Sequence, residues 1–277
     1  MPLATMLDQL LTTIIKRPYV FAFLAAYLFL ALRRFGWKRT LLWLVSGYLI
    51  AWLSEYSSIH NGFPYGHYKY VYENMPGELM VAGVPFFDSL SYVFLTFAGF
   101  MTGRFVIEHR LSLRAKRSNL AVQTEIAASP SRAPRDDNWK IALKLVVFGA
   151  FLTMMLDVII DPVATMGAKW FLGEIHYYVH PGFYFGVPLT NFGGWFLVAF
   201  AIIGFNVVAW KAFPNFLGGL KMRDKILPLE PFLYLSVGIF QTVMAFVIGA
   251  YLLGCINATL CVIVGALLPH MNGKKKE

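Results

Sequence analysis

Long apolar runs alternate with shorter polar stretches along most of this chain. A helix needs about 20 mainly apolar residues to cross a bilayer, so runs of this length predict membrane spans. The pattern predicts an all-α, polytopic membrane helical bundle that forms a single transmembrane domain over residues 1–277. Seven spans are expected, at about residues 18–32, 40–56, 84–103, 139–160, 187–210, 231–252 and 254–269.

Composition supports a membrane protein and argues against a soluble one. The chain is 58% hydrophobic and 14% charged, whereas soluble domains carry about 25% charged residues. A net charge of +9 could suit nucleic acid in a soluble protein. In a membrane protein it reflects the excess of Lys and Arg in cytoplasmic loops. We therefore expect membrane lipid, and no nucleic acid, around this chain.

The charges of the loops predict the orientation of the bundle. Lys and Arg concentrate in every second connection, whereas loops 57–82 and 162–185 are nearly free of them. Because basic loops remain in the cytoplasm, we expect an integral protein of the cell (inner) membrane with its N-terminus outside and its C-terminus in the cytoplasm. The basic segments are residues 33–39, 104–140, 211–230 and 274–276.

One connection has a different composition from the others. Residues 110–138 are polar, poor in aromatic residues and punctuated by Ser, Ala and Pro. A segment of this composition cannot bury a core, so we expect a disordered cytoplasmic linker within the domain. A basic arm that binds the lipid surface is the functional alternative.

A motif that occurs twice predicts an internal parallel repeat. Residues 83–92 and 186–195 both begin with Gly-Val-Pro, have Asp or Asn at the sixth position, and end with Tyr or Trp. Glu55 precedes the first copy by 28 residues, and Asp157 precedes the second by 29. Self-similarity at a fixed spacing indicates repeated supersecondary units. Here each unit is expected to be a helix, a polar loop and a second helix.

The predicted orientation brings the unusual polar residues to one level. Glu55 and Asp157 close helices that run outward, whereas Asp88 and Asn191 open helices that run inward. At a rise of about 1.5 Å per residue, all four lie at a similar depth in the outer leaflet. Acids within a membrane are costly and mark functional sites by default. The alternative, a helix end among lipid headgroups, applies most to Asp161, which directly precedes a proline.

The two outer loops are dense in aromatic rings. They predict either an aromatic belt at the membrane interface or two lids over a protein-enclosed pocket, where irregular backbone is tolerated. His176 and His180 lie four residues apart, but Pro181 ends any helix there, so no metal site is expected. Asn206 and Gln241, which lie within spans, predict interhelical hydrogen bonds. The loop rings are Phe63, Tyr65, Tyr68, Tyr70, Tyr72, Trp170, Phe171, Tyr177, Tyr178, Phe183, Tyr184 and Phe185.

Several stretches of the chain match one known pattern. They are Glu55; Asn61, Gly62, Phe63, Pro64, Tyr65, Gly66, His67, Tyr68, Lys69 and Tyr70; Gly83, Val84 and Pro85; Asp157, Asp161, Pro162, Ala164, Gly167 and Trp170; and residues 184–195. Together they resemble the membrane carotenoid biosynthesis protein family over roughly residues 40–250, without the linker. Known members include carotenoid hydratases that act on gamma-carotene and on bisanhydrobacterioruberin. The linker and the stretch from Trp170 to Gly182 depart from the family pattern.

The resemblance implies cofactor-free addition of water to a terminal isoprenoid double bond of a long acyclic or monocyclic carotenoid, which gives a tertiary alcohol. We hypothesise that Asp157 protonates the alkene and Glu55 deprotonates water, or the reverse. Asp88 and Asp161 support them, and aromatic faces stabilise the carbocation. The expected substrate-binding residues are Tyr65, Tyr92, Trp170, Tyr184, Asn191 and Trp195.

A protein without chemistry is the competing interpretation. Repeated helix pairs around a polar midplane site are common in transporters, and intramembrane acids also suit proton coupling. The sequence therefore also fits a binder or transporter of carotenoids or lipids. Neither interpretation requires a metal or another cofactor, and the pattern predicts no particular oligomeric state.

Overall fold

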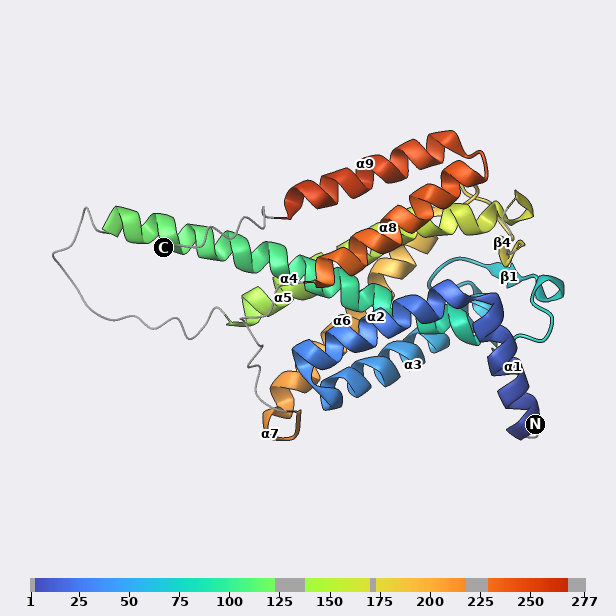
Figure 1. Ribbon diagram of the computed structural model, residues 1–277, viewed down its shortest axis with the longest axis horizontal. Helices are drawn as coiled ribbons and strands as arrows, with labels where there is room; N and C mark the ends of the chain where they lie inside the picture. Colours follow the sequence, from blue (N-terminus) through green and yellow to red (C-terminus); the bar gives the residue numbers. More distant parts are fainter. Residues whose placement is uncertain (1–2, 123–137, 170–172, 218–228, 269–277) are drawn as a thin grey trace.

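Nine α-helices and four short strands make up the described part of the chain. The computed structural model describes residues 3–122, 138–169, 173–217 and 229–268 (Figure 1). The predicted all-α bundle is confirmed. The helices are α1 (Leu3–Lys16), α2 (Pro18–Phe35), α3 (Trp37–Asn61), α4 (Phe86–Val122), α5 (Asn138–Thr165), α6 (Leu189–Ala212), α7 (Pro214–Leu217), α8 (Glu230–Val247) and α9 (Tyr251–Leu267). The strands are β1 (Tyr68–Tyr70), β2 (Met80–Val81), β3 (Val84–Pro85) and β4 (His176–Tyr178).

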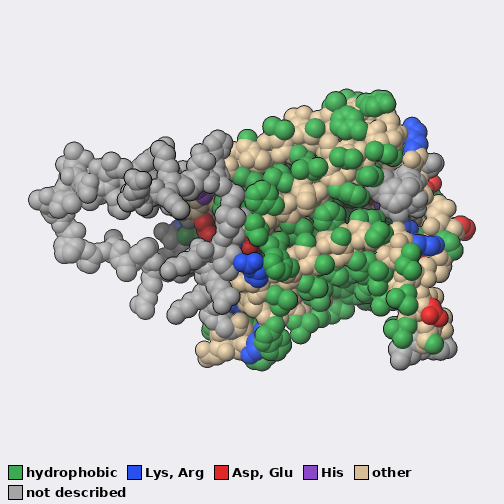
Figure 2. Space-filling model, viewed as in Figure 1, with side chains coloured by type: hydrophobic (Ala, Val, Ile, Leu, Met, Phe, Trp, Pro, Cys, Tyr) green, Lys and Arg blue, Asp and Glu red, His purple; other side chains and the backbone are tan. Residues whose placement is uncertain are grey.

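Five of the described helices are long and apolar enough to cross a membrane. They lie in α2, α4, α5, α6 and α8. The remaining predicted spans coincide with α3, which carries Lys38, Arg39 and Glu55 among its 25 residues, and with α9, which has 17 residues. Hydrophobic side chains cover much of the face shown in Figure 2. The membrane assignment therefore holds, while the count of seven spans stays a prediction.

A separate amphipathic helix precedes the first predicted span. α1 ends at Lys16, and Pro18 begins α2, because proline fits the first turn of a helix but not its interior. Met6, Leu11 and Ile15 of α1 are exposed, as in helices that lie in a membrane interface. Arg17 at the junction is buried and holds Glu78 through two bonds of 2.9 and 2.8 Å. The junction is thereby tied to the loop before α4.

The centre of the bundle is formed by α3, α4, α5 and α6. The membrane-length part of α4 is 78% buried, against 50% or less for the other four such helices. α4 and α5 approach closely because both carry glycines at the crossing: a Cβ on Gly99 would lie 2.8 Å from the Gly149 carbonyl oxygen. The Asn206 side-chain amide of α6 donates to Ser46 Oγ of α3 at 2.8 Å, which confirms the predicted interhelical hydrogen bond.

Strands from the two outer loops pair above this centre. β1 and β4 are antiparallel, with Tyr68 opposite Tyr178 and Tyr70 opposite His176. The described loop rings differ in burial, and Tyr184 and Phe185 are half-buried. Tyr65, Tyr68, Tyr70 and Tyr178 are buried, whereas Phe63, Tyr72, Tyr177 and Phe183 are exposed. The loops therefore act as lids that bury one set of rings and present the other to the surroundings.

The repeated motif has the same backbone conformation in both copies. Ala82 and Gly83 have φ of 51° and 81°, and Phe185 and Gly186 have φ of 49° and 87°. Two successive positive φ angles define the tight hairpin turn that favours glycine. Val81 pairs with Val84 across the first turn, and residues 184 and 187 pair across the second. The matching turns support an internal repeat of helix, strand, turn and helix.

The predicted linker falls only partly within the described residues. α4 continues to Val122, so the first part of residues 110–138 is helical. Residues 123–137 lie outside the described part of the chain, and the linker expectation for them stays a prediction.

Candidate active site

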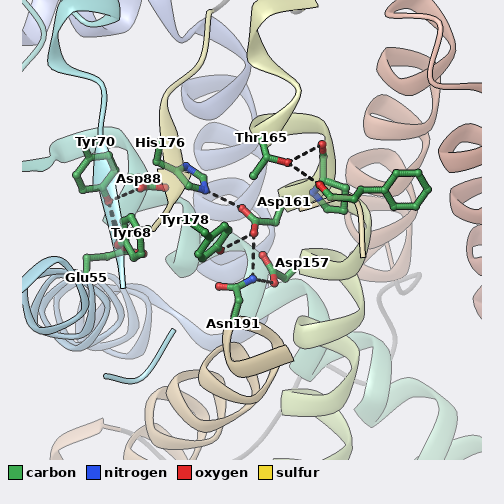
Figure 3. Close-up of polar contacts among 12 residues, drawn as sticks. Glu55, Tyr68, Tyr70, Asp88, Asp157, Asp161, Thr165, His176, Tyr178 and Asn191 are labelled. Carbon is green, nitrogen blue, oxygen red and sulfur yellow. Dashed lines mark hydrogen bonds and ion pairs between the residues drawn. The ribbon is translucent and has the colours of Figure 1, made fainter. Parts of the chain in front are cut away.

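A cluster of acids and phenols lies where four helix ends meet beneath β1 and β4 (Figure 3). Glu55 and Asp157 lie towards the C-terminal ends of α3 and α5, and Asp88 and Asn191 lie in the first turns of α4 and α6. Glu55, Asp157, Asp161 and Asn191 are at most 7% exposed, and Asp88 is partly buried. The structure thus places these five polar residues of the sequence prediction in one buried group.

Two tyrosines of β1 join the acids of the first repeat. Tyr70 Oη lies 2.9 Å from Glu55 Oε2 and 2.6 Å from Asp88 Oδ2. Tyr68 Oη also donates to Glu55 Oε2. A phenol has one proton, so Tyr70 can donate to one carboxylate and accept from the other if that one keeps its proton. The arrangement therefore suits a pair of carboxyl groups that share one proton.

The acids of the second repeat have unequal surroundings. Asp161 accepts from Tyr178 Oη at 2.6 Å and from Asn191 Nδ2 at 3.1 Å, and His176 Nε2 lies 3.1 Å from its other oxygen. Asp157 accepts from Asn191 Nδ2 at 2.7 Å through one oxygen. Asp161 is therefore held on both oxygens, whereas Asp157 keeps one oxygen available to a ligand.

Tyr70, Tyr178 and His176 of the two strands have shifted pKa values. Burial, followed by the charges of neighbouring carboxylates, raises the pKa of Tyr70 and Tyr178 well above the usual value. Both phenols therefore stay protonated and can donate. Burial alone would lower the pKa of His176, but the hydrogen bond and charge of Asp161 raise it above its usual value. His176 therefore keeps its positive charge to a higher pH than a free imidazole does.

Two adjoining spaces of opposite character surround this cluster. The larger, which we call the apolar cavity, has a volume of about 110 Å³. It is lined by Tyr19, Phe23, Phe87, Asp88, Ser91, Phe94, Leu95, Asp157, Ile160, Asp161, Val163, Ala164, Ile175, His176, Trp195, Val237 and Gln241. The smaller, which we call the polar pocket, has a volume of about 40 Å³. It is lined by Glu55, Tyr65, Tyr68, Asp88, Tyr92, Asp161, His176, Tyr178, Asn191 and Trp195.

Three aromatic rings line the polar pocket, and one of them, Trp195, also lines the apolar cavity. Tyr92 and Trp195 stack with centroids 3.9 Å apart and planes 11° apart, and Tyr65 lies 6.1 Å from Tyr92. The hydroxyls of Tyr65 and Tyr92 are buried beside Glu55 without a well-formed hydrogen bond in the described structure. Buried hydroxyls normally have a partner, so these two groups are suited to bind a guest in the polar pocket.

Other predicted residues lie elsewhere. Tyr184 lines neither space, since its hydroxyl donates to the Val158 carbonyl at 3.4 Å and its ring contacts Phe192. Trp170 lies outside the described residues. Gln241 was expected to bond another helix, but its Oε1 is buried without a partner in the described structure and the side chain lines the apolar cavity. The prediction of an interhelical hydrogen bond is therefore wrong for the Oε1 atom of Gln241.

The sequence reasoning missed the part played by the two strands. In the sequence, His176 stood out only as a possible metal ligand together with His180, and His180 is exposed in the structure. Among the residues that the structure describes, no group of three potential ligands is placed to hold a metal. The signal for the strands was the alternation of Tyr68 and Tyr70 with an exposed Lys69, which is the period of a strand with one buried face.

Membrane-length helices that enclose buried carboxylates beside an apolar cavity define a polytopic membrane protein with an internal polar site. The family described as carotenoid biosynthesis protein matches residues 16–267, so the chain belongs to this family. Comparison with curated proteins gave no match, and no solved structure matches the chain. The family places the protein in carotenoid biosynthesis, which agrees with the resemblance seen in its motifs.

Proposed function

We propose that this protein is a carotenoid hydratase, which adds water across a terminal isoprenoid double bond to give a tertiary alcohol. The observation that carries the proposal is the contact between the apolar cavity and the polar pocket. The two spaces share Asp88, Asp161, His176 and Trp195 as lining residues. An alkene suits the first space and water suits the second, which exceeds the roughly 15 Å³ that one water needs. Reaction occurs at the shared wall.

Asp157 is the proton donor in this proposal. It lines the apolar cavity and not the polar pocket, and one of its oxygens is not engaged by Asn191. General acids within reach of a reacting atom contribute factors of about 10²–10⁴ to the rate. Transfer of the proton to the less substituted alkene carbon leaves a tertiary cation on the other carbon.

Aromatic faces then stabilise the cation. Trp195 lines both spaces and stacks on Tyr92. Cations are attracted to the faces of such rings, by about 2 kcal/mol or more when water is absent. A cation next to Trp195 is also open to attack from the polar pocket, because the same ring borders it.

Glu55 is the base that completes the addition. It lines the polar pocket together with Tyr65 and Tyr92, whose hydroxyls lie beside it and can hold a water there. The water oxygen forms a bond to the tertiary carbon while one of its protons passes to Glu55. The sum is one water added to one double bond, with no oxidant or reductant.

The proton taken up by Glu55 has a route towards the second repeat as far as Asp161, and a water in the cavity would pass it on to Asp157, because the Asn191 amide only donates to these two carboxylates. Tyr70 bridges Glu55 and Asp88, and Asn191 and His176 contact Asp161. Figure 3 shows His176 between Asp88 and Asp161. Proton relays within membrane proteins use such chains of carboxyl and imidazole groups. His176 would carry the proton from one repeat to the other.

The test is a pigment analysis of a carotenoid-producing host that expresses the protein. The expected result is a new, more polar carotenoid that is heavier by one water, and its absence when the host expresses Asp157→Asn. Unaltered pigments at normal protein level in the membrane would overturn the proposal. Pigment that changes its distribution without a change in mass would instead favour a binding or transport protein.

A further inference from the structure

A groove runs between α2 and α8 on the outside of the bundle. Its volume is about 440 Å³. It is lined almost entirely by apolar side chains and is widened by the small Ala22, Ala26 and Ser236. The full lining is Ala22, Phe23, Ala26, Phe29, Leu30, Leu229, Phe232, Leu233 and Ser236. The helices beside it belong to the membrane-length set, so the groove opens towards lipid.

The groove adjoins the apolar cavity, with the Phe23 side chain between the two spaces. Phe23 lines both spaces, and Val237 of the cavity follows Ser236 of the groove directly along α8. Rings of neighbouring helices surround this passage: Phe23 contacts Phe94 with centroids 5.7 Å apart and Phe240 at 6.0 Å. A ligand chain in the groove would therefore have to displace the Phe23 side chain to bring its end into the cavity.

An ion pair lies beyond the other end of the groove. Arg34 of α2 and Glu230 of α8 form a bidentate pair, with Nε–Oε1 at 2.6 Å and Nη2–Oε2 at 3.0 Å. This pair lies beyond Leu30 and next to Leu229, at the C-terminal end of α2 and the N-terminal end of α8. From Ala22 to Leu30 the groove follows about 12 Å of helix at 1.5 Å per residue. It thus receives an extended chain that lies along α2.

We propose that this groove binds the polyene chain of the substrate, so that its terminal double bond passes Phe23 and reaches Asp157. The identity of the end group rests on the proposed function, whereas the chain site rests on the groove itself. A long conjugated chain is stiff and extended, which fits a straight apolar groove that adjoins the cavity at Phe23. The same geometry lets substrate arrive from the lipid without crossing the lids.

The experiment compares groove-filling variants with a matched control. Ala26→Phe and Ser236→Phe fill the groove from opposite walls, and Ala201→Phe places the same side chain on an exposed position of α6. All are made in the Asp157→Asn background, so that the ligand stays unchanged. Binding of an acyclic carotene to the purified protein in detergent is then measured by the absorbance that remains with the protein after gel filtration.

We expect both groove variants to bind the carotene about tenfold or more weakly than the parent, a loss of about 1.4 kcal/mol, and Ala201→Phe to bind like the parent. If Ala26→Phe and Ser236→Phe both bound the carotene as tightly as the parent, the groove site would be overturned. Thermal unfolding of each variant shows whether a loss of carotene binding reflects misfolding. If one groove variant does not fold, the carotene binding of the other variant tests the groove site. Carotene that binds through the groove but is never hydrated by the unmodified protein would refute the hydratase and not the groove.

Discussion

Asp157 and Asp161 lie one helical turn apart on α5, but their surroundings assign them different roles. Asp161 is engaged on both oxygens, whereas Asp157 has one oxygen free beside the apolar cavity. Replacing Asp157 by Asn keeps the shape and removes the transferable proton. We expect Asp157→Asn to lower hydration about 10²-fold or more, measured as hydrated carotenoid formed per amount of protein.

Glu55 gives the companion prediction, because an amide cannot take a proton from water. Glu55→Gln should lower hydration by a similar factor, about 10²-fold. Glu73→Gln, at an exposed position of the outer loop, is the control and should leave activity unchanged. Full activity in both Asp157→Asn and Glu55→Gln, with normal folding, would remove the acid and base from the mechanism.

His176 should make stability depend on pH. Its folded-state pKa lies above the usual value because Asp161 outweighs burial. The stabilisation from the charged pair is therefore complete below about pH 6.5 and is lost as pH rises through the higher folded-state pKa. His176→Gln should lower the free energy of unfolding by about 1–3 kcal/mol in acid, and by less in alkali. Thermal unfolding of both proteins in detergent across a range of pH measures the difference in stability. A difference between His176→Gln and the unmodified protein that grows with pH would contradict the prediction.

At the scale of residues, sequence located the carboxylates but not their partners. Glu55, Asp88 and Asp157 stand out because acids are rare in apolar spans. His176 and Tyr178 do not, because histidines and tyrosines are common in loops and their contacts with Asp161 depend on tertiary structure. Tyr184 was predicted as a site residue because it is one of the aromatic residues of the second loop, but its hydroxyl donates to the backbone carbonyl of Val158.

At the scale of elements, two adjacent glycines of α6 offer a matched test of how the first lid is seated. A Cβ on Gly194 would lie 2.6 Å from Tyr65 Cδ1 and 2.7 Å from the Pro64 oxygen. A Cβ on Gly193 would meet nothing within 4 Å. Gly194→Ala should therefore destabilise the protein by about 1–3 kcal/mol and displace Tyr65 from the ring cluster.

Gly193→Ala should be neutral or stabilising by about 0.5–1 kcal/mol, because alanine is the better helix former. Thermal unfolding and hydration activity of both variants check the pair of expectations. If Gly194→Ala retained the stability and activity of Gly193→Ala, the lid would not depend on close contact with α6.

The helices could be predicted from sequence because their signal is local, but the lid sheet could not. Apolar runs and flanking charges give the position and direction of each span, and these alone bring Glu55 and Asp157 to one level. The pairing of β1 with β4 joins segments about a hundred residues apart, and such short strands leave little pattern. The two-residue turn at Gly83 and Gly186 was visible as a repeat, but its positive φ angles were not.

At the scale of the whole molecule, the two copies of the repeat differ in a way that would suit the two substrates of the proposed reaction. The first contributes Glu55 to the polar pocket, and the second contributes Asp157 to the apolar cavity. Asn191 stands in the second repeat where the first has Asp88. Two identical units would offer two equal sites, whereas in the proposed mechanism these two unequal halves form one site with an acid on one side and a base on the other.

The orientation of the bundle decides which aqueous side supplies the water. Basic loops predict that the lids face outward, and Lys69 of β1 and Lys211 of α6 lie exposed at opposite ends. With Cys255 and Cys261 replaced by Ser, Lys69→Cys should react with a membrane-impermeant maleimide in intact spheroplasts. Lys211→Cys should react only after the membrane is opened. The reverse pattern would place the polar pocket at the cytoplasmic face, and water would then reach Glu55 from the cytoplasm.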